Sequence, residues 1–243
     1  MGQKTTYSYE VGTEKVDFML RATIEALCAD ILNVAGVDAK VNGISADLLM
    51  QQNRSWVLSR MSVELDRQPE QYEKYDISTW VNPHASRLIS PRNFELRDSQ
   101  GCLFGRAVSQ WCMIDFDTRM PADMNTMAQA HEGNMVDAPS PCERPRRLMA
   151  VDGEALLQHR VAYSDIDFNR HMNTMRYIDI IFDSMPIEVP EKMEALRMDI
   201  NFMREARYGD NLSLHCEERD SVRNYEYRNA AGEALCRAAL ELK

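Results

Sequence analysis

Residues 95–107 (ELRDSQGCLFGRA) and residues 226–238 (EYRNAAGEALCRA) match each other at one constant offset. Each stretch has a turn that begins with Asp or Asn and ends with Gly, between strand-like residues. The matched residues are Glu95, Arg97, Gly101, Arg106 and Ala107 in the first stretch, and Glu226, Arg228, Gly232, Arg237 and Ala238 in the second. A generic β-turn explains the turn ends but not the arginines. The match therefore indicates a duplicated structural unit.

The sequence before the first stretch predicts one helix followed by strands. Residues 15–36 (KVDFMLRATIEALCADILNVAG) carry apolar side chains at three- and four-residue spacing, which predicts an amphipathic helix. Gly36 is well placed to end it, because glycine adopts the left-handed conformation of a helix C-cap without a steric penalty. Segments 54–65, 75–82, 88–98 and 103–116 alternate in polarity and are rich in β-branched and aromatic residues, which predicts antiparallel strands.

The second half repeats this order. Segment 156–164 is strand-like, 173–184 is helical, and 195–205, 210–220, 225–229 and 235–242 are strand-like. Between the halves, residues 137–147 (DAPSPCERPRR) hold three prolines and no periodicity, which is typical of a linker. We therefore predict an α+β fold of two units, each a helix wrapped by a curved antiparallel sheet, at residues 1–136 and 149–243, joined by a linker at 137–148.

Composition excludes several classes of function. The 28 Lys and Arg against 38 Asp and Glu give a net charge of −10, which argues against a nucleic-acid surface. No run approaches the roughly 18 apolar residues of a membrane span, and the first residues are too polar for a signal peptide. We expect a cytoplasmic protein without a membrane contact.

The six cysteines show no metal-site or disulfide pattern. They form no C-x-x-C pair and have no His at zinc-finger spacing, so we expect no metal and interpret them as reduced, small core residues. They are Cys28, Cys102, Cys112, Cys142, Cys216 and Cys236.

The richest polar cluster precedes the second helix and consists of Asp165, Asp167, Asn169, His171 and Asn173. In an extended backbone, Asp167, Asn169 and His171 project to one side, and the helix that follows offers unpaired N–H groups for a developing oxyanion. Such a set suits chemistry at a carbonyl. Asp and Asn are also common turn and cap residues, so the motif alone is weak. A hard metal site lacks a second carboxylate cluster.

Several segments resemble the acyl-acyl carrier protein thioesterases, a family that includes plant plastid enzymes. In the second half these are residues 163–177 and 201–210 (NFMREARYGD). In the first half they are residues 56–69 (WVLSRMSVELDRQP), 76–81 (DISTWV) and the stretch from RDSQG to FDTRMP at 97–121. The resemblance covers nearly the whole chain.

The resemblance implies a double hotdog fold with its active site in the second unit only. The D-x-N-x-H motif of the family falls on Asp167, Asn169 and His171, and its downstream acidic residue falls on Glu205. The first unit is then the acyl-binding half, with its helix and residues 56–61 as candidate tunnel lining. Plant members carry a cysteine after the acidic residue, and here Ala206 takes that position, so a cysteine nucleophile is unsupported.

The implied activity is hydrolysis of fatty acyl-acyl carrier protein thioesters, which releases free fatty acid and ends fatty acid synthesis without a cofactor. Glu205 or Asp167 would work as the carboxylate, while Asn169 and His171 orient it and the attacking water. Direct attack by a carboxylate and activation of water both stay open. The partner is acyl carrier protein with its phosphopantetheine-linked acyl chain, and a homodimer is possible. Because such carriers are acidic, we propose the linker arginines as a docking patch, at Arg144, Arg146 and Arg147.

Three other functions are alternatives to hydrolysis of carrier-bound thioesters. An acyl-CoA thioesterase could use the same site. Hotdog hydratases place Pro between Asn and His with an extra residue, or carry a Gly-His pair, and residues 168–173 (FNRHMN) have neither. A silent acyl-binding module would lack one of the four polar residues, and all four are present. The sequence leaves acyl chain length and branching open.

Overall fold

The computed structural model describes residues 3–83, 86–118, 120–124 and 135–243, and their strands form one antiparallel sheet. The strand order is β1-β3-β4-β5-β2-β7-β10-β9-β8-β6. The first half contributes β1 (Thr5–Glu10), β2 (Arg54–Leu65), β3 (Lys74–Val81), β4 (Ser90–Asp98) and β5 (Leu103–Asp115). The second half contributes β6 (Ala155–Arg160), β7 (Leu196–Phe202), β8 (Asn211–Arg219), β9 (Val222–Asn229) and β10 (Ala234–Leu242).

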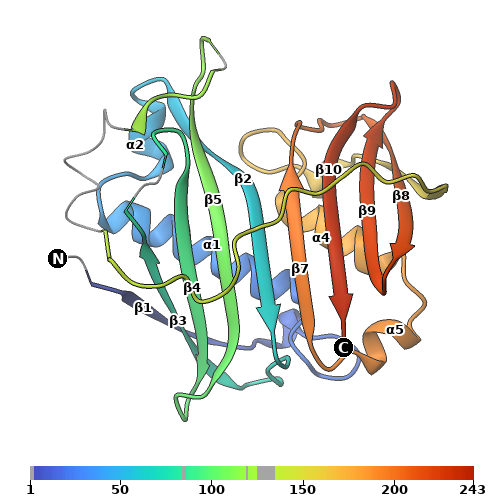
Figure 1. Ribbon diagram of the computed structural model, residues 1–243, viewed down its shortest axis with the longest axis horizontal. Coiled ribbons are helices and arrows are strands. Elements are labelled where there is room, and N and C mark those ends of the chain that lie inside the picture. The colour runs from blue at the N-terminus through green and yellow to red at the C-terminus, as the bar shows by residue number, and fades with distance from the viewer. Residues whose placement is uncertain (1–2, 84–85, 119, 125–134) are drawn as a thin grey trace.

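Two helices, α1 (Ile24–Val41) and α4 (Thr174–Asp183), lie on one face of this sheet and contact each other (Figure 1). Within the described residues each half thus has one strand, one central helix and four further strands, and the halves join where β2 pairs with β7. Single 3-10 turns at Thr13–Lys15 and Tyr163–Asp165 precede the helices, and two short helices follow them, α2 (Ala46–Met50) and α5 (Glu188–Lys192). This architecture confirms the predicted α+β double hotdog fold.

The duplicated stretches occupy equivalent places in the sheet. Glu95 faces Arg106 across β4 and β5, and Glu226 faces Arg237 across β9 and β10. The turn glycines between them have left-handed φ values of 79° and 77°, which glycine adopts without strain. Of the arginines that a turn does not explain, Arg106 and Arg237 therefore belong to cross-strand pairs on the outer face of the sheet.

The first helix begins and ends later than predicted. Thr23 caps its start, because its hydroxyl accepts the N–H of Ala26 at 3.1 Å, and residues 15–22 before it form turns and bridges. The chain passes helically through Gly36 and reverses at Gly43, whose φ is 72°. Gly36 is therefore not the C-cap. A Cβ at Gly36 would meet nothing within 4 Å, because this face of α1 borders a cavity.

Every strand-like segment of the sequence overlaps an observed strand, whereas β1, α2 and α5 escaped prediction. The strand β1 lies at the sheet edge with a polar sequence, TTYSYE, and α2 and α5 are too short to show a helical period. The core lies between the sheet and the two central helices. It buries two of the six cysteines, Cys28 and Cys236, but Cys102 is exposed and the other three are partly exposed, so the prediction of core residues is wrong for these four.

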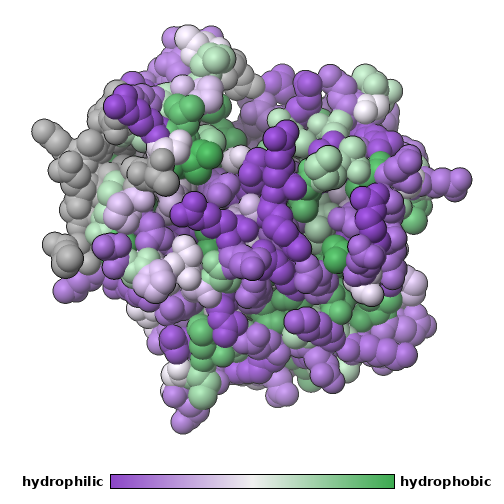
Figure 2. All heavy atoms as spheres, viewed as in Figure 1, coloured by the Kyte–Doolittle hydropathy of each residue, from purple (hydrophilic) through white to green (hydrophobic). Residues whose placement is uncertain are grey.

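The segment between the halves is a fixed strap on the outer face of the sheet. Figure 1 shows it crossing the face opposite the helices, and Figure 2 shows hydrophilic side chains over the middle of that face. The Oγ of Ser62 donates to the Glu143 carbonyl at 3.1 Å, and Asn201 bonds the backbone of Arg146 and Leu148 at 2.9 and 3.0 Å. The proline-rich composition therefore marks an anchored connection. Among the described residues, no helix is long and apolar enough to cross a membrane.

Candidate active site

The motif before α4 folds as a tight turn and not as an extended segment. The Asp167 Oδ1 accepts the backbone N–H groups of Asn169 at 2.8 Å and of His171 at 3.2 Å. The Asp167 N–H donates to the His171 carbonyl at 2.9 Å, and Arg170 adopts a left-handed φ of 64°. The carboxylate of Asp167 therefore organises the turn that presents the other two residues.

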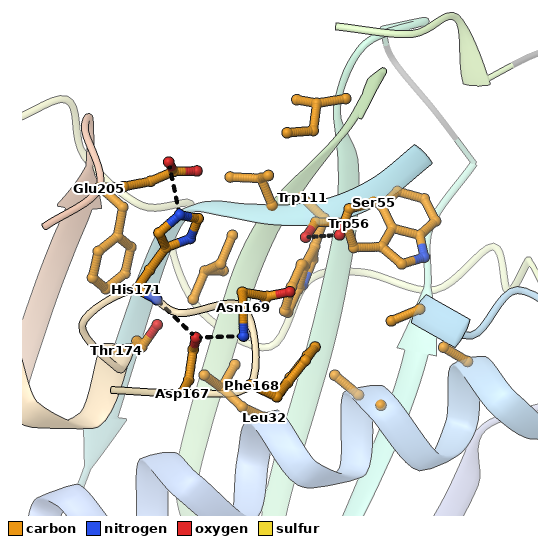
Figure 3. Close-up of a pocket in the computed structure, with 18 of the residues that line it drawn as sticks. Leu32, Ser55, Trp56, Trp111, Asp167, Phe168, Asn169, His171, Thr174 and Glu205 are labelled. Atoms are coloured by element: carbon orange, nitrogen blue, oxygen red, sulfur yellow. Dashed lines mark hydrogen bonds and ion pairs between the residues drawn. The ribbon is translucent and has the colours of Figure 1, made fainter. Parts of the chain in front are cut away.

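The turn brings His171 to Glu205, which follows β7. Their Nε2 and Oε2 atoms are 3.1 Å apart, and the side chains are 25% and 35% exposed (Figure 3). The Met172 N–H donates to the Ala206 carbonyl at 2.8 Å, which holds the two segments side by side. All four residues of the predicted site, Asp167, Asn169, His171 and Glu205, line one cavity.

The other two members of the sequence cluster have structural roles. Asn173 caps α4, because its Oδ1 accepts the Met175 N–H at 2.9 Å. Asp165 is 1% exposed and pairs with His159 at 2.7 Å and Arg176 at 2.9 Å. Burial raises the pKa of Asp165, but the Ala162 N–H, Arg176 and His159 outweigh burial and hold the pKa below its usual range. The pairing of His159 with Asp165 escaped prediction, because His159 lies in the preceding strand and outside the D-x-N-x-H motif. His84 and His131 lie outside the described residues.

The first half contains the same turn without the same chemistry. Asp17 Oδ1 accepts the N–H groups of Met19 at 2.8 Å and Arg21 at 3.0 Å, as Asp167 does for Asn169 and His171. The Ala22 N–H meets the Pro69 carbonyl at 2.8 Å, in the place of the Met172 contact. The first unit therefore retains the aspartate turn but has Met and Arg where the second has Asn and His.

A segment of the second unit contacts this first turn. The Arg21 guanidinium donates to the carbonyls of Pro190 at 2.9 Å and Met193 at 3.2 Å, in and after α5. None of Asp17, Met19 and Arg21 lines the cavity. This difference supports an active site in the second unit only.

The cavity has a volume of about 880 Å³ and reaches from the turn into the first unit, between α1 and the sheet. Its wall includes Leu32, Ala35 and Ala39 on α1, and Trp56, Val57 and Leu58 on β2. These positions agree with the predicted lining for α1 and for residues 56–58, but Ser59, Arg60 and Met61 do not line the cavity. The cavity wall is largely apolar, as an acyl chain requires.

The linker arginines are not a free cluster. Arg146 pairs with Asp199 at 2.7 Å and Glu241 at 2.6 Å, and its backbone bonds Asn201, so it anchors the strap on the sheet. Arg144 and Arg147 are exposed. Among the described residues there is no group of three or more His, Cys, Asp or Glu side chains that could hold a metal ion.

Comparison with known proteins agrees with this architecture. The family model of the acyl-ACP thioesterase N-terminal domain matches residues 2–130, and that of the C-terminal domain matches residues 150–243. The chain belongs to the acyl-ACP thioesterase family. Members of this family are hydrolases.

Solved structures support the assignment. An acyl-ACP thioesterase from Bacteroides thetaiotaomicron is 34% identical, with a TM-score of 0.90 over 99% of this chain and 98% of that one. The 12:0-ACP thioesterase from Umbellularia californica has a TM-score of 0.85 over 100% and 98% of the two chains, and at 17% identity it shows the shared fold alone.

Curated relatives are longer than this chain. A palmitoyl-acyl carrier protein thioesterase of Arabidopsis thaliana, named as chloroplastic, is 26% identical over 213 residues, which cover 82% of this chain and 50% of the relative. An oleoyl-acyl carrier protein thioesterase of the same plant is 28% identical over 226 residues, 84% and 59% of the two chains. The chain spans about half the length of the curated relatives it matches.

Proposed function

We propose that this protein hydrolyses fatty acyl-acyl carrier protein thioesters, which releases the free fatty acid and ends fatty acid synthesis. The observation that carries the proposal is the His171–Glu205 pair, 3.1 Å apart, at one end of a largely apolar cavity. A thioester bound at this pair would place its acyl chain in the cavity and direct its thiol portion towards the carrier protein. Family membership and the solved relative from Bacteroides thetaiotaomicron support the same substrate class.

In the proposed mechanism Glu205 is the working carboxylate. It takes a proton from a water molecule whose oxygen attacks the thioester carbon, the carbon–sulfur bond breaks, and the proton passes to the leaving thiolate. His171 holds Glu205 in line with the water through its Nε2. Asp167 acts through these residues, because its Oδ1 is occupied by the two backbone N–H groups of the turn. It is therefore a positioning residue.

Asn169 and the start of α4 are the proposed donors to the thioester oxygen. The Asn169 side chain points into the cavity (Figure 3), and among the described residues its carboxamide has no hydrogen bond. Thr174, the first residue of α4, also lines the cavity, and a first-turn N–H has no partner within its own helix. Two such donors would stabilise the negative oxygen of the tetrahedral intermediate.

The two halves have separate roles in this proposal. Residues 149–243 supply the turn and Glu205, and residues 1–136 supply most of the wall that would hold the acyl chain, with 137–148 as the connection. A homodimer stays a prediction. The β2–β7 pairing already unites the halves within one chain, so activity per chain should not change on dilution. A cytoplasmic location also stays a prediction.

We propose that the carrier protein docks on the exposed surface beside Asp167. Tyr163 is 90% exposed, Phe168 78% and Tyr208 66%, and Arg170 is exposed among them. Exposed aromatic side chains next to an arginine are typical of a protein-binding surface, and Arg170 offers an acidic carrier a positive charge on a protein of charge −10. This surface fits docking better than the linker arginines, because Arg146 is used to hold the strap.

Thiol release tests the proposed function. We expect the purified protein to release thiol from acyl carrier protein substrates with a higher kcat/KM than from the acyl-CoA of the same chain. Equal rates on both series would favour the acyl-CoA thioesterase. Release from neither series would favour the silent acyl-binding module or the hydratase, which hydration of an enoyl thioester would separate.

A further inference from the structure

Two polar side chains in the cavity wall have hydrogen-bonding capacity that the fold does not use. Ser90 and Arg92 lie two residues apart on β4, so they project to the same face of the sheet, and both line the cavity. They are 4% and 5% exposed. Among the described residues, the Ser90 hydroxyl makes no hydrogen bond, and Arg92 uses only its Nη1, towards Asp38 and Thr79. Its Nε and Nη2 have no partner there.

The indole groups of the same wall are satisfied. The Trp56 Nε1 donates to the Ile44 carbonyl at 2.9 Å, and the Trp111 Nε1 donates to the Ser109 Oγ at 2.8 Å. These indoles present apolar rings to the cavity. A buried donor without an acceptor is costly, so such donors in a binding cavity indicate that the ligand supplies the acceptor. Ser90 and Arg92 thus form a polar spot in an otherwise apolar wall.

The charges around Ser90 and Arg92 favour a neutral ligand oxygen over a carboxylate. Asp38, itself 4% exposed, accepts from Arg92 at 2.5 Å and from Asn42 at 3.0 Å, so the buried guanidinium is already neutralised. A carboxylate bound at this spot would add an uncompensated buried negative charge. A neutral oxygen would not. A hydroxyl can accept from Arg92 and donate to Ser90, and an oxo group can accept from both.

The spot lies far from the catalytic pair. Ser90 pairs with Trp111 on β5, Trp111 pairs with Leu58 on β2, and β2 neighbours β7, which leads to Glu205. Three strand spacings separate β4 from β7 by about 14 Å. An oxygen bound at Ser90 therefore belongs to the distal part of the acyl chain.

We propose that the cavity accepts acyl chains that carry a hydroxyl or oxo group in their distal part, bound by Ser90 and Arg92. This inference rests on the proposed function, because it takes the cavity as the acyl site. It goes beyond that function by naming the substrate class. A water molecule held at the same spot is the competing explanation.

The test compares carrier-bound chains of one length, unsubstituted or with a distal hydroxyl or oxo group. We expect the wild-type kcat/KM to favour at least one oxygenated chain by at least about fivefold, the effect of one additional hydrogen bond. Ser90→Ala should bring the hydroxyl preference, measured against the unsubstituted chain of the same length, near one. Arg92→Lys, which keeps a cation beside Asp38 but has no Nε, should weaken the preference for both groups. The control is Ser62→Ala, which removes a buried hydroxyl outside the cavity and should leave the ratios unchanged.

Calorimetric binding of the free fatty acids separates this inference from the proposed function. If the protein hydrolyses no thioester but binds oxygenated acids more tightly than the unsubstituted acid, the function fails and the inference stands. If wild type hydrolyses and binds all chains alike, water alone occupies the spot and the inference is overturned. A preference that survives in both Ser90→Ala and Arg92→Lys also overturns it.

Discussion

Asp167 and Asp17 hold the same turn in two copies, but only the copy with Asp167 opens on the cavity. A carboxylate that served only in catalysis would have no reason to be matched in the copy that does not line the cavity. The shared backbone contacts therefore support a positioning role. The chemistry then falls to the residues that differ between the copies, which are Asn169 and His171 in the second and Met19 and Arg21 in the first.

This role predicts different results for two substitutions. Asp167→Asn keeps an oxygen that accepts the two N–H groups, so kcat should stay within about fivefold of wild type. Asp167→Ala removes the acceptor, and misplacement of Asn169 and His171 should cost about 10²-fold. Steady-state thiol release measures both. Asp17→Ala is the matched control, because it breaks the equivalent turn outside the cavity and should lower stability without lowering kcat. A loss of about 10²-fold or more in Asp167→Asn would instead make Asp167 a proton carrier.

The proposed docking surface can be tested at a single residue. Arg170→Glu should raise KM for the carrier substrate several-fold at low salt and leave KM for a small soluble thioester unchanged, because only the carrier is an acidic partner. The matched control is Arg147→Glu on the strap, which should change neither value. An effect of Arg147→Glu alone would favour the linker patch that the sequence suggested.

The residues of the candidate site could be named from the sequence, but their arrangement could not. Asp167, Asn169, His171 and Glu205 follow from the family resemblance, and all four line the cavity. Alternating polarity does not predict the left-handed turn at Arg170 or the pairing of Asp165 with His159, because both depend on backbone and tertiary contacts. Ser90 and Arg92 escaped notice because they lie in a strand-like segment far from the motif.

At the scale of elements, α1 decides the shape of the cavity. Its face towards the cavity carries Leu32 and the small residues Ala35, Gly36 and Ala39, which leave room beside the helix. Gly36 makes a good C-cap by sequence, yet the helix continues past it to Val41. Gly36 therefore does not mark the end of the helix. Its missing side chain leaves space for the cavity.

Gly36→Ala tests this interpretation. The new Cβ meets nothing within 4 Å, so the substitution should raise the free energy of unfolding by about 0.5–1 kcal/mol through helix propensity. Gly36→Leu should reach into the cavity and shift the preferred substrate to a shorter acyl chain. Thermal unfolding and thiol release over a series of chain lengths measure the two effects. An unchanged length profile in Gly36→Leu would show that the chain does not pass this helix face.

At the scale of the whole molecule, the two halves share one sheet, and buried carboxylates on its outer face form ion pairs with arginines. Glu226 is 2% exposed and pairs with Arg228 and Arg237, and Asp199 pairs with Arg146 of the strap and with Arg197. Burial raises the pKa of Glu226, but its hydrogen bonds to Arg228 and Arg237 outweigh burial and hold the pKa below its usual range.

This network predicts loss of stability in acid. The folded-state pKa values of Glu226 and Asp165 are depressed, so their contributions are complete above the unfolded-state values of about 4 and disappear as pH falls through the folded values. The Tm should therefore drop steeply below about pH 4. Circular dichroism melts between neutral pH and strong acid measure this. Glu226→Gln should lower the Tm at neutral pH and flatten the acid slope; an identical slope would exclude Glu226 as a source.

Duplication was visible in the sequence, while the union of the halves was not. The match of Glu95 and Arg106 to Glu226 and Arg237 predicts two similar units. The β2–β7 pairing and the path of the strap depend on long-range contacts, such as Ser62 to Glu143 and Asn201 to Leu148, that no local pattern signals.

The central claim is that Glu205, held by His171, drives thioester hydrolysis at one end of the cavity. The most direct measurement is single-turnover thiol release from a carrier-bound acyl chain by wild type, Glu205→Gln and His171→Ala, beside the Kd of each for the free fatty acid. We predict a fall of at least about 10²-fold in the rate of both variants with an unchanged Kd. A Glu205→Gln rate within about threefold of wild type would contradict the account.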